Sequence, residues 1–116
     1  MSFGSGKTPT KAESARMDAI KSGPCLACKQ RGLKSAFPDV HHLLSGGIRR
    51  GHRYTIGLCP WHHRASSWHE GLTPEYFRRV YGPSLAEGSK PFHLEFGSDQ
   101  FLLDMQDRLI EGSKAA

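Results

Sequence analysis

The chain has 116 residues, the usual length of a single domain with one modest core. Only 37% of the residues are hydrophobic, and there are 13 glycines and seven prolines. A small core of this kind needs additional stabilisation, such as a bound metal ion. No apolar run approaches the roughly 20 residues of a membrane span, which argues against a membrane protein. Three cysteines, an odd number, argue against a disulfide framework and for metal binding in a reducing cytoplasm.

Positive charge is concentrated in the first two thirds of the chain. Residues 1–35 carry seven Lys/Arg against two acids, and residues 40–69 carry four arginines and no acid. Residues 70–116 carry five bases and eight acids. This asymmetry favours a polyanionic partner such as nucleic acid, although ordinary solvated charges explain a mild excess about as well.

The first half of the chain predicts a helix followed by two short strands. Residues 1–10 are expected to form a flexible basic arm, and a helix then begins at a Thr cap and stops at Gly23 and Pro24. Residues 25–33 predict a tight turn. Strands are expected at residues 35–42 and 53–59, joined by a loop that contains two adjacent glycines.

Helices dominate the predicted second half. Pro60 is expected to open a short helix, because the first turn of a helix tolerates proline. Residues 73–82 predict another helix with Thr73 as its cap, and residues 99–110 predict a closing amphipathic helix that ends at Gly112.

Two pairs of metal-binding residues share the same spacing. Cys25 and Cys28 have a two-residue gap, and Cys59 and His62 repeat it. Three thiolates and one imidazole complete a tetrahedral zinc shell. The sequence therefore predicts a structural zinc ion that supplies folding free energy on the order of 10 kcal/mol.

Histidine doublets suggest a second site beside the zinc. In an extended strand Asp39 and His41 face one way and His42 faces the other. We expect His41 and His63 to hold a divalent cation, with Asp39 behind His41 as a hydrogen-bond acceptor, and His42 to act as a general base. For any single histidine the alternative is an ordinary surface or core residue.

A strand ending in "DVHH", a glycine-containing loop, a second strand and then "LCPWHH" opening a helix resemble the HNH endonuclease family, whose fold is the ββα-metal finger. The stretch "GHRYTIGLCPWHHR" together with "YGPSLAEGSKPFHLEFGS" is similar to the zinc-containing HNH domain of the phage recombination-enhancement, RecA-dependent nucleases (Ref). The resemblance covers about residues 22–110. It implies a small zinc-stabilised α+β fold in which flanking helices surround the finger, with residues 1–21 as arm and first helix and 22–116 as the nuclease domain.

The resemblance also implies an activity: hydrolysis of DNA phosphodiester bonds in a bacterial cytoplasm, by a phage-encoded enzyme acting on DNA held by RecA. His42 would be the general base, and His41 and His63 would bind Mg²⁺, with Mn²⁺ or Zn²⁺ as alternatives. The residues implied for the structural zinc are Cys25, Cys28, Cys59 and His62. No small-molecule cofactor is expected.

Two departures from the family pattern leave a second interpretation open. The usual asparagine is replaced by Tyr54, with His52 as the nearest polar substitute, and the usual third metal ligand is replaced by Ser67. His93 can serve as a ligand only if the tail folds back. Phosphate contacts are expected from four arginines: Arg49, Arg50, Arg53 and Arg64. The alternative function is a zinc-stabilised module that binds DNA or protein without cleavage.

Overall fold

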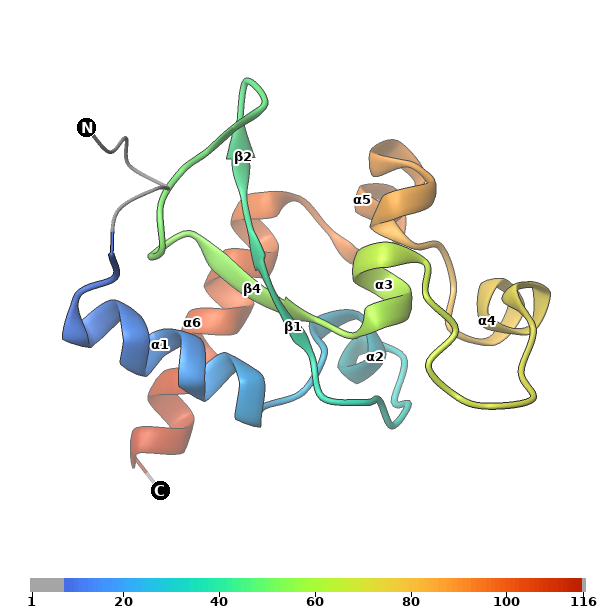
Figure 1. Cartoon of the computed structure of the whole chain (residues 1–116), viewed down its shortest axis with the longest axis horizontal. Helices are drawn as coiled ribbons and strands as arrows, with labels where there is room; N and C mark the ends of the chain where they lie inside the picture. The colour runs from blue at the N-terminus through green and yellow to red at the C-terminus, as the bar shows by residue number, and fades with distance from the viewer. Residues whose placement is uncertain (1–7, 116) are drawn as a thin grey trace.

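The fold is a small α+β arrangement in which helices surround a two-stranded sheet (Figure 1). The computed structural model describes residues 8–115. The predicted basic arm falls largely on residues 1–7, outside the described residues. The elements in chain order are α1 (Lys11–Ser22), α2 (Leu26–Gln30), β1 (Asp39–His42), β2 (Leu44–Ser45), β3 (Ile48–Arg49), β4 (Thr55–Leu58), α3 (Pro60–Arg64), α4 (Pro74–Val80), η2 (Leu85–Glu87, a 3₁₀ turn), α5 (Ser89–Phe96) and α6 (Asp99–Ala115).

Strands β1 and β4 form an antiparallel pair at the centre of the molecule. Asp39 lies opposite Leu58, and His42 lies opposite Thr55. All four residues of β4 are buried, whereas β1 is half-buried along its length. The predicted strands are therefore confirmed, with shorter bounds than the sequence indicated.

A second, smaller ladder lies in the segment predicted as an irregular loop. Strands β2 and β3 pair through Leu44 with Arg49 and Ser45 with Ile48. The connecting glycines have φ angles of 59° and 83°, as a two-residue hairpin turn of type I′ requires. Leu43 lies between the two ladders: its carbonyl oxygen accepts the Arg50 N–H at 2.9 Å beside the hairpin, and its own N–H donates to the Tyr54 carbonyl oxygen at 2.8 Å beside the central pair. It projects away from the body of the protein (Figure 1).

Helix α1 begins and ends as the sequence predicted and packs on the body of the protein. Thr10 and Glu13 form a reciprocal capping box at its start. Arg16 joins three elements, because its guanidinium donates to the Thr55 side chain at 3.0 Å and to Asp107 of α6 at 2.7 Å. The division between residues 1–21 and 22–116 stays a prediction.

Three helical predictions need correction. Residues 25–33 contain the helix α2, where a tight turn was expected, since Cys25 accepts a hydrogen bond from the Cys28 N–H and so caps the helix. The sequence did not predict helix α5, because a proline inside a segment argues against a helix. Pro91 lies in the first turn of α5, where no N–H donor is needed. Helix α6 runs through Gly112 to Ala115 and does not stop at the glycine.

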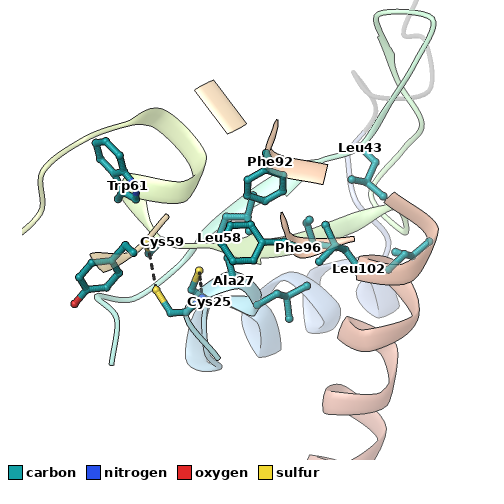
Figure 2. Close-up of a cluster of buried hydrophobic side chains, with 14 of the residues drawn as sticks. Cys25, Ala27, Leu43, Leu58, Cys59, Trp61, Phe92, Phe96 and Leu102 are labelled. Atoms are coloured by element: carbon teal, nitrogen blue, oxygen red, sulfur yellow. Dashed lines mark hydrogen bonds between the residues drawn. The ribbon is translucent and has the colours of Figure 1, made fainter. Parts of the chain in front are cut away.

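Aromatic and aliphatic side chains from both halves of the chain form one core. Trp61, Phe92 and Phe96 are at most 1% exposed, and they gather with Leu58 beside the cysteines (Figure 2). Trp68 packs edge-on against Phe77 and Tyr81. Both tryptophans therefore serve packing. In residues 8–115, no helix has the length and apolarity needed to span a bilayer.

The buried Gln106 provides the first test of this architecture. It is 2% exposed and its Oε1 accepts the N–H of Gly57 in β4 at 2.8 Å. Gln106→Met keeps the side-chain volume but leaves that buried N–H without an acceptor. We expect a loss of about 1–3 kcal/mol in the free energy of unfolding, measured by urea denaturation of zinc-loaded protein.

Gln100→Met is the matched control on the same helix. Gln100 is exposed, and within residues 8–115 its side chain donates to Asp104 alone. Its substitution should change the free energy of unfolding by less than about 0.5 kcal/mol. Equal stability of both variants would contradict the assigned role of Gln106.

Candidate metal centre and active site

A buried group of three cysteines and one histidine forms a candidate zinc site. The ligand atoms of Cys25, Cys28, Cys59 and His62 all lie within 4.8 Å of one another, and all four residues are buried. His62 Nδ1 lies 3.4 Å from Cys25 Sγ and 3.3 Å from Cys59 Sγ. The Cys28 and Cys59 sulfurs are 3.8 Å apart. Tetrahedral zinc with ordinary bond lengths requires sulfur–sulfur separations of about 3.8 Å and nitrogen–sulfur separations of about 3.6 Å, so this group fits the ion.

Two short helices hold the four ligands in place. Cys25 is the N-cap of α2 and Cys59 is the N-cap of α3, so in each pair the second ligand lies in the first helical turn. Each N-cap sulfur accepts a backbone N–H from the second ligand of its own pair, at 3.4 and 3.5 Å. The two-residue gap that occurs twice in the sequence therefore places both ligand pairs in the same arrangement, with one ligand at the N-cap of a short helix and the other in its first turn.

The imidazole of His62 is oriented for metal binding. Its Nε2 lies 2.8 Å from the Tyr81 carbonyl oxygen, to which an N–H donates, so Nδ1 presents its lone pair to the three sulfurs. Burial alone lowers the pKa of His62, but hydrogen bonds with Cys25 and Cys59 outweigh it and raise this pKa to about 9. The sulfur cluster therefore favours a positive charge at its centre, which zinc supplies.

His41 and His63 lie beside each other at a second location. Their ring centroids are 5.0 Å apart in an edge-to-face arrangement. Burial, followed by the positive potential of His63, lowers the pKa of His41 to about 4. A neutral imidazole is the form that binds a metal ion.

Asp39 contacts a different histidine from the one expected. Its Oδ2 accepts from His63 Nδ1 at 2.9 Å and from Arg64 Nε at 2.8 Å, so the carboxylate lies behind His63 and not behind His41. The prediction failed because it considered only the alternation of side chains along β1. Helix α3 brings His63 to the start of β1, and this tertiary contact cannot be inferred from that alternation. Burial would raise the pKa of Asp39, yet hydrogen bonds from His63 and Arg64 hold it below its ordinary value.

His42 lies on the other face of β1 and contacts His52. His42 Nε2 and His52 Nδ1 are 3.1 Å apart. His52 is the nearest polar substitute for the asparagine that is usual in the HNH family, and it therefore lies beside His42, the candidate base. Burial, and then Arg49 and His52, lower the pKa of His42, which keeps its imidazole neutral near pH 7.

A cavity of about 480 Å³ contains His41 and His63. The tail of the chain folds back onto it, so His93 and Asp99 also line the cavity. His93 Nε2 donates to Asp99 Oδ1 at 2.8 Å. Sequence reasoning named His93 conditionally and missed Asp99, because only the packing of α5 and α6 brings them to the histidines. The cavity lining includes neither Ser67 nor His42.

The four predicted DNA-contacting arginines follow the exposed side of this region. Arg49 is on β3, and Arg50 lies over the Tyr54 ring with its guanidinium 4.4 Å from the ring centroid. Arg53 is exposed. Arg64 is half-exposed and bound to Asp39, so its charge is already partly compensated.

The fold and these two sites define a small α+β protein with a Cys₃His group that could hold zinc and a histidine-lined cavity. Residues 9–111 match the family described as "Recombination enhancement, RecA-dependent nuclease". The match covers most of the chain, and the chain belongs to this family. A general assignment as a nuclease of DNA recombination follows from that membership.

Zinc analysis tests the Cys₃His site. We expect about one tightly bound zinc per chain in the wild type, and loss of this zinc with loss of folding in Cys25→Ser, because the free energy of metal binding is part of the free energy of folding. Elemental analysis and circular dichroism provide the two measurements.

His69→Asn serves as the control, because His69 is exposed and its ring nitrogen contacts only the Glu70 backbone. This variant should keep its zinc and its fold. A folded Cys25→Ser protein with undiminished zinc would show that the ion binds elsewhere.

Proposed function

We propose that the protein is a metal-dependent DNA endonuclease of the HNH type, in which β1, β4 and α3 form the ββα-metal finger. The observation that carries the proposal is the meeting of His41 from β1 with His63 from α3 at one cavity, while His42 turns to the opposite face. Family membership as a nuclease supports the same reaction class.

His41 and His63 are the proposed protein ligands of the catalytic cation. A divalent cation held there would stabilise the negative charge that develops on the phosphate oxygens and on the leaving 3′ oxygen. Mg²⁺ is the proposed ion, with Mn²⁺ and Zn²⁺ as alternatives. Asp39 acts through His63. Its carboxylate accepts the His63 Nδ1–H at 2.9 Å and so holds the imidazole ring with Nε2 on the side away from Asp39.

His42 is the proposed general base, with His52 as its orienting partner. His42 Nε2 lies 3.1 Å from His52 Nδ1, and the proposed tautomer is the one in which His42 donates, because it leaves His42 Nδ1 as the basic nitrogen that takes the proton from the attacking water. His52 thereby performs the bracing that the family asparagine performs elsewhere. Because β1 ends at His42, the scissile phosphate is expected at this end of the strand, between the two histidine faces.

The substrate class is DNA, bound by its phosphates. Arg49, Arg50 and Arg53 come from the hairpin and the segment after it; Arg49 and Arg53 are exposed and Arg50 is partly exposed. Contacts of this kind provide affinity without reading base sequence. The family description further supports RecA-bound DNA as the substrate, and a bacterial cytoplasm with a phage origin stays a prediction.

Plasmid nicking by wild type and His42→Ala tests the chemistry. With Mg²⁺ or Mn²⁺, the variant should nick supercoiled DNA about 10²–10⁴-fold more slowly, because a general base contributes about that factor. His69→Ala should retain wild-type nicking. Equal nicking by wild type and His42→Ala, or none by either on any DNA, would favour the non-catalytic binding module. The same assay on RecA-made displaced loops tests RecA dependence.

Arginine substitution tests the DNA surface. Arg49→Ala should weaken DNA binding by a similar factor for every sequence, and should lower the slope of log affinity against log salt by about one, as loss of one phosphate contact requires. Fluorescence anisotropy across a salt series measures both quantities.

Arg79→Ala is its control, since Arg79 is an exposed arginine on α4, at the edge of the molecule away from the hairpin (Figure 1). It should leave affinity and salt slope unchanged. Equal effects of the two substitutions would mean that the hairpin arginines form no specific DNA surface.

A further inference from the structure

The cavity that holds His41 and His63 has a wall from outside the β1–β4–α3 unit. Ser89 and His93 belong to α5, and Asp99 is the first residue of α6. Among the described residues that line the cavity, Asp99 is the only one with a carboxylate. Asp39 also contacts His63, but it lies behind the ring at Nδ1 and does not line the cavity, so Asp99 is the carboxylate that faces the cavity itself.

We propose that Asp99 is an oxygen ligand of the cation held by His41 and His63, with His93 as the positioning residue that orients its carboxylate. This inference rests on the proposed function for the identity of the cation site. It extends that function by assigning the missing third ligand to the α5–α6 corner.

Ligand chemistry supports an oxygen donor at this place. Mg²⁺ and Mn²⁺ prefer carboxylate, carbonyl and water oxygens, whereas imidazole suits Zn, Cu, Fe and Ni. Two histidines alone make a weak Mg²⁺ site. Adding the Asp99 carboxylate gives two nitrogens and one oxygen, and leaves further positions for water and phosphate oxygens.

Hydrogen bonds hold Asp99 ready for this task. His93 Nε2 donates to Asp99 Oδ1 at 2.8 Å, and in that tautomer His93 Nδ1 accepts the Ser89 Oγ–H at 3.0 Å. No other described residue has a recorded hydrogen bond to Asp99, so Oδ2 is available for the cation. The pair is a carboxylate–histidine arrangement of the kind that orients metal ligands.

The corner between α5 and α6 is built as a fixed turn. Gly97 has φ 106°, and a Cβ at this position would overlap the Phe101 ring. The Gly97 N–H donates to the His93 carbonyl oxygen at 2.9 Å, and Ser98 Oγ accepts the Phe101 N–H at 3.1 Å. Because the turn is fixed at both ends, Asp99 keeps its place beside His93 without a cation.

Manganese binding to the full chain, carrying one zinc per molecule, is the test. Asp99→Asn, which keeps the shape and removes the charge, should raise the Kd for Mn²⁺ at least tenfold in calorimetric titration. His93→Gln should raise it about 10-fold to 100-fold, because partners of metal ligands contribute that much to affinity. Asp104→Asn is the matched control, since Asp104 is an exposed acid of α6 that does not line the cavity. It should keep the wild-type Kd.

Nuclear magnetic resonance of the wild type gives a reading that needs no variant. Mn²⁺ should broaden the imidazole signals of His41, His63 and His93 at sub-stoichiometric addition and leave exposed His69 sharp. An unchanged Kd in Asp99→Asn, or broadening that spares His93, would overturn the proposal.

The outcomes separate this inference from the proposed function. If His42→Ala abolishes nicking while Asp99→Asn binds Mn²⁺ normally, the nuclease assignment stands and Asp99 is not a ligand. If Asp99→Asn weakens Mn²⁺ binding while the wild type never nicks DNA, the cation site stands and the nuclease assignment fails.

Discussion

The Cys₃His group is the interaction on which the rest of the fold depends. It joins the start of α2 to the start of α3, two segments more than 30 residues apart in sequence, through sulfur and nitrogen atoms spaced as tetrahedral zinc requires. The intervening chain contains β1 and β4, so the same closure lies at the end of the central strand pair where the start of β1 meets the end of β4. With its limited apolar content, a chain of this size gains from a bound metal the stability that a larger core provides elsewhere.

The zinc group and the histidine cavity share helix α3. His62 turns toward the sulfurs and contacts the Tyr81 carbonyl oxygen, while His63, one residue further along, meets His41 and Asp39. Successive residues of a helix point about 100° apart, so one short helix serves two sites on different faces. The doublet "HH" in the second motif therefore has one member in the Cys₃His group and one at the histidine cavity, and the two members of the strand doublet likewise lie on opposite faces of β1.

Local patterns were sufficient where the chemistry is local. The spacing of the cysteines and His62 predicted that these four residues come together, Pro60 predicted the start of α3, and a Thr cap predicted the starts of α1 and α4. The prediction failed where contacts join distant segments. Asp39 was assigned to His41 because strand parity considers β1 alone, and Asp99 was missed because nothing near it in sequence resembles a metal motif.

Helix α5 explains why the candidate active site requires the whole chain. Phe92 and Phe96 are spaced by four residues, and both are buried with His62, whose ring meets Phe96 edge-on at 5.1 Å between centroids. His93 lies about 100° around the helix from Phe92 and lines the cavity. The packing that covers the zinc ligands thus also sets the position of His93. A change that separated the Cys₃His group would therefore disturb the surface on which α5 packs, and with it one wall of the histidine cavity.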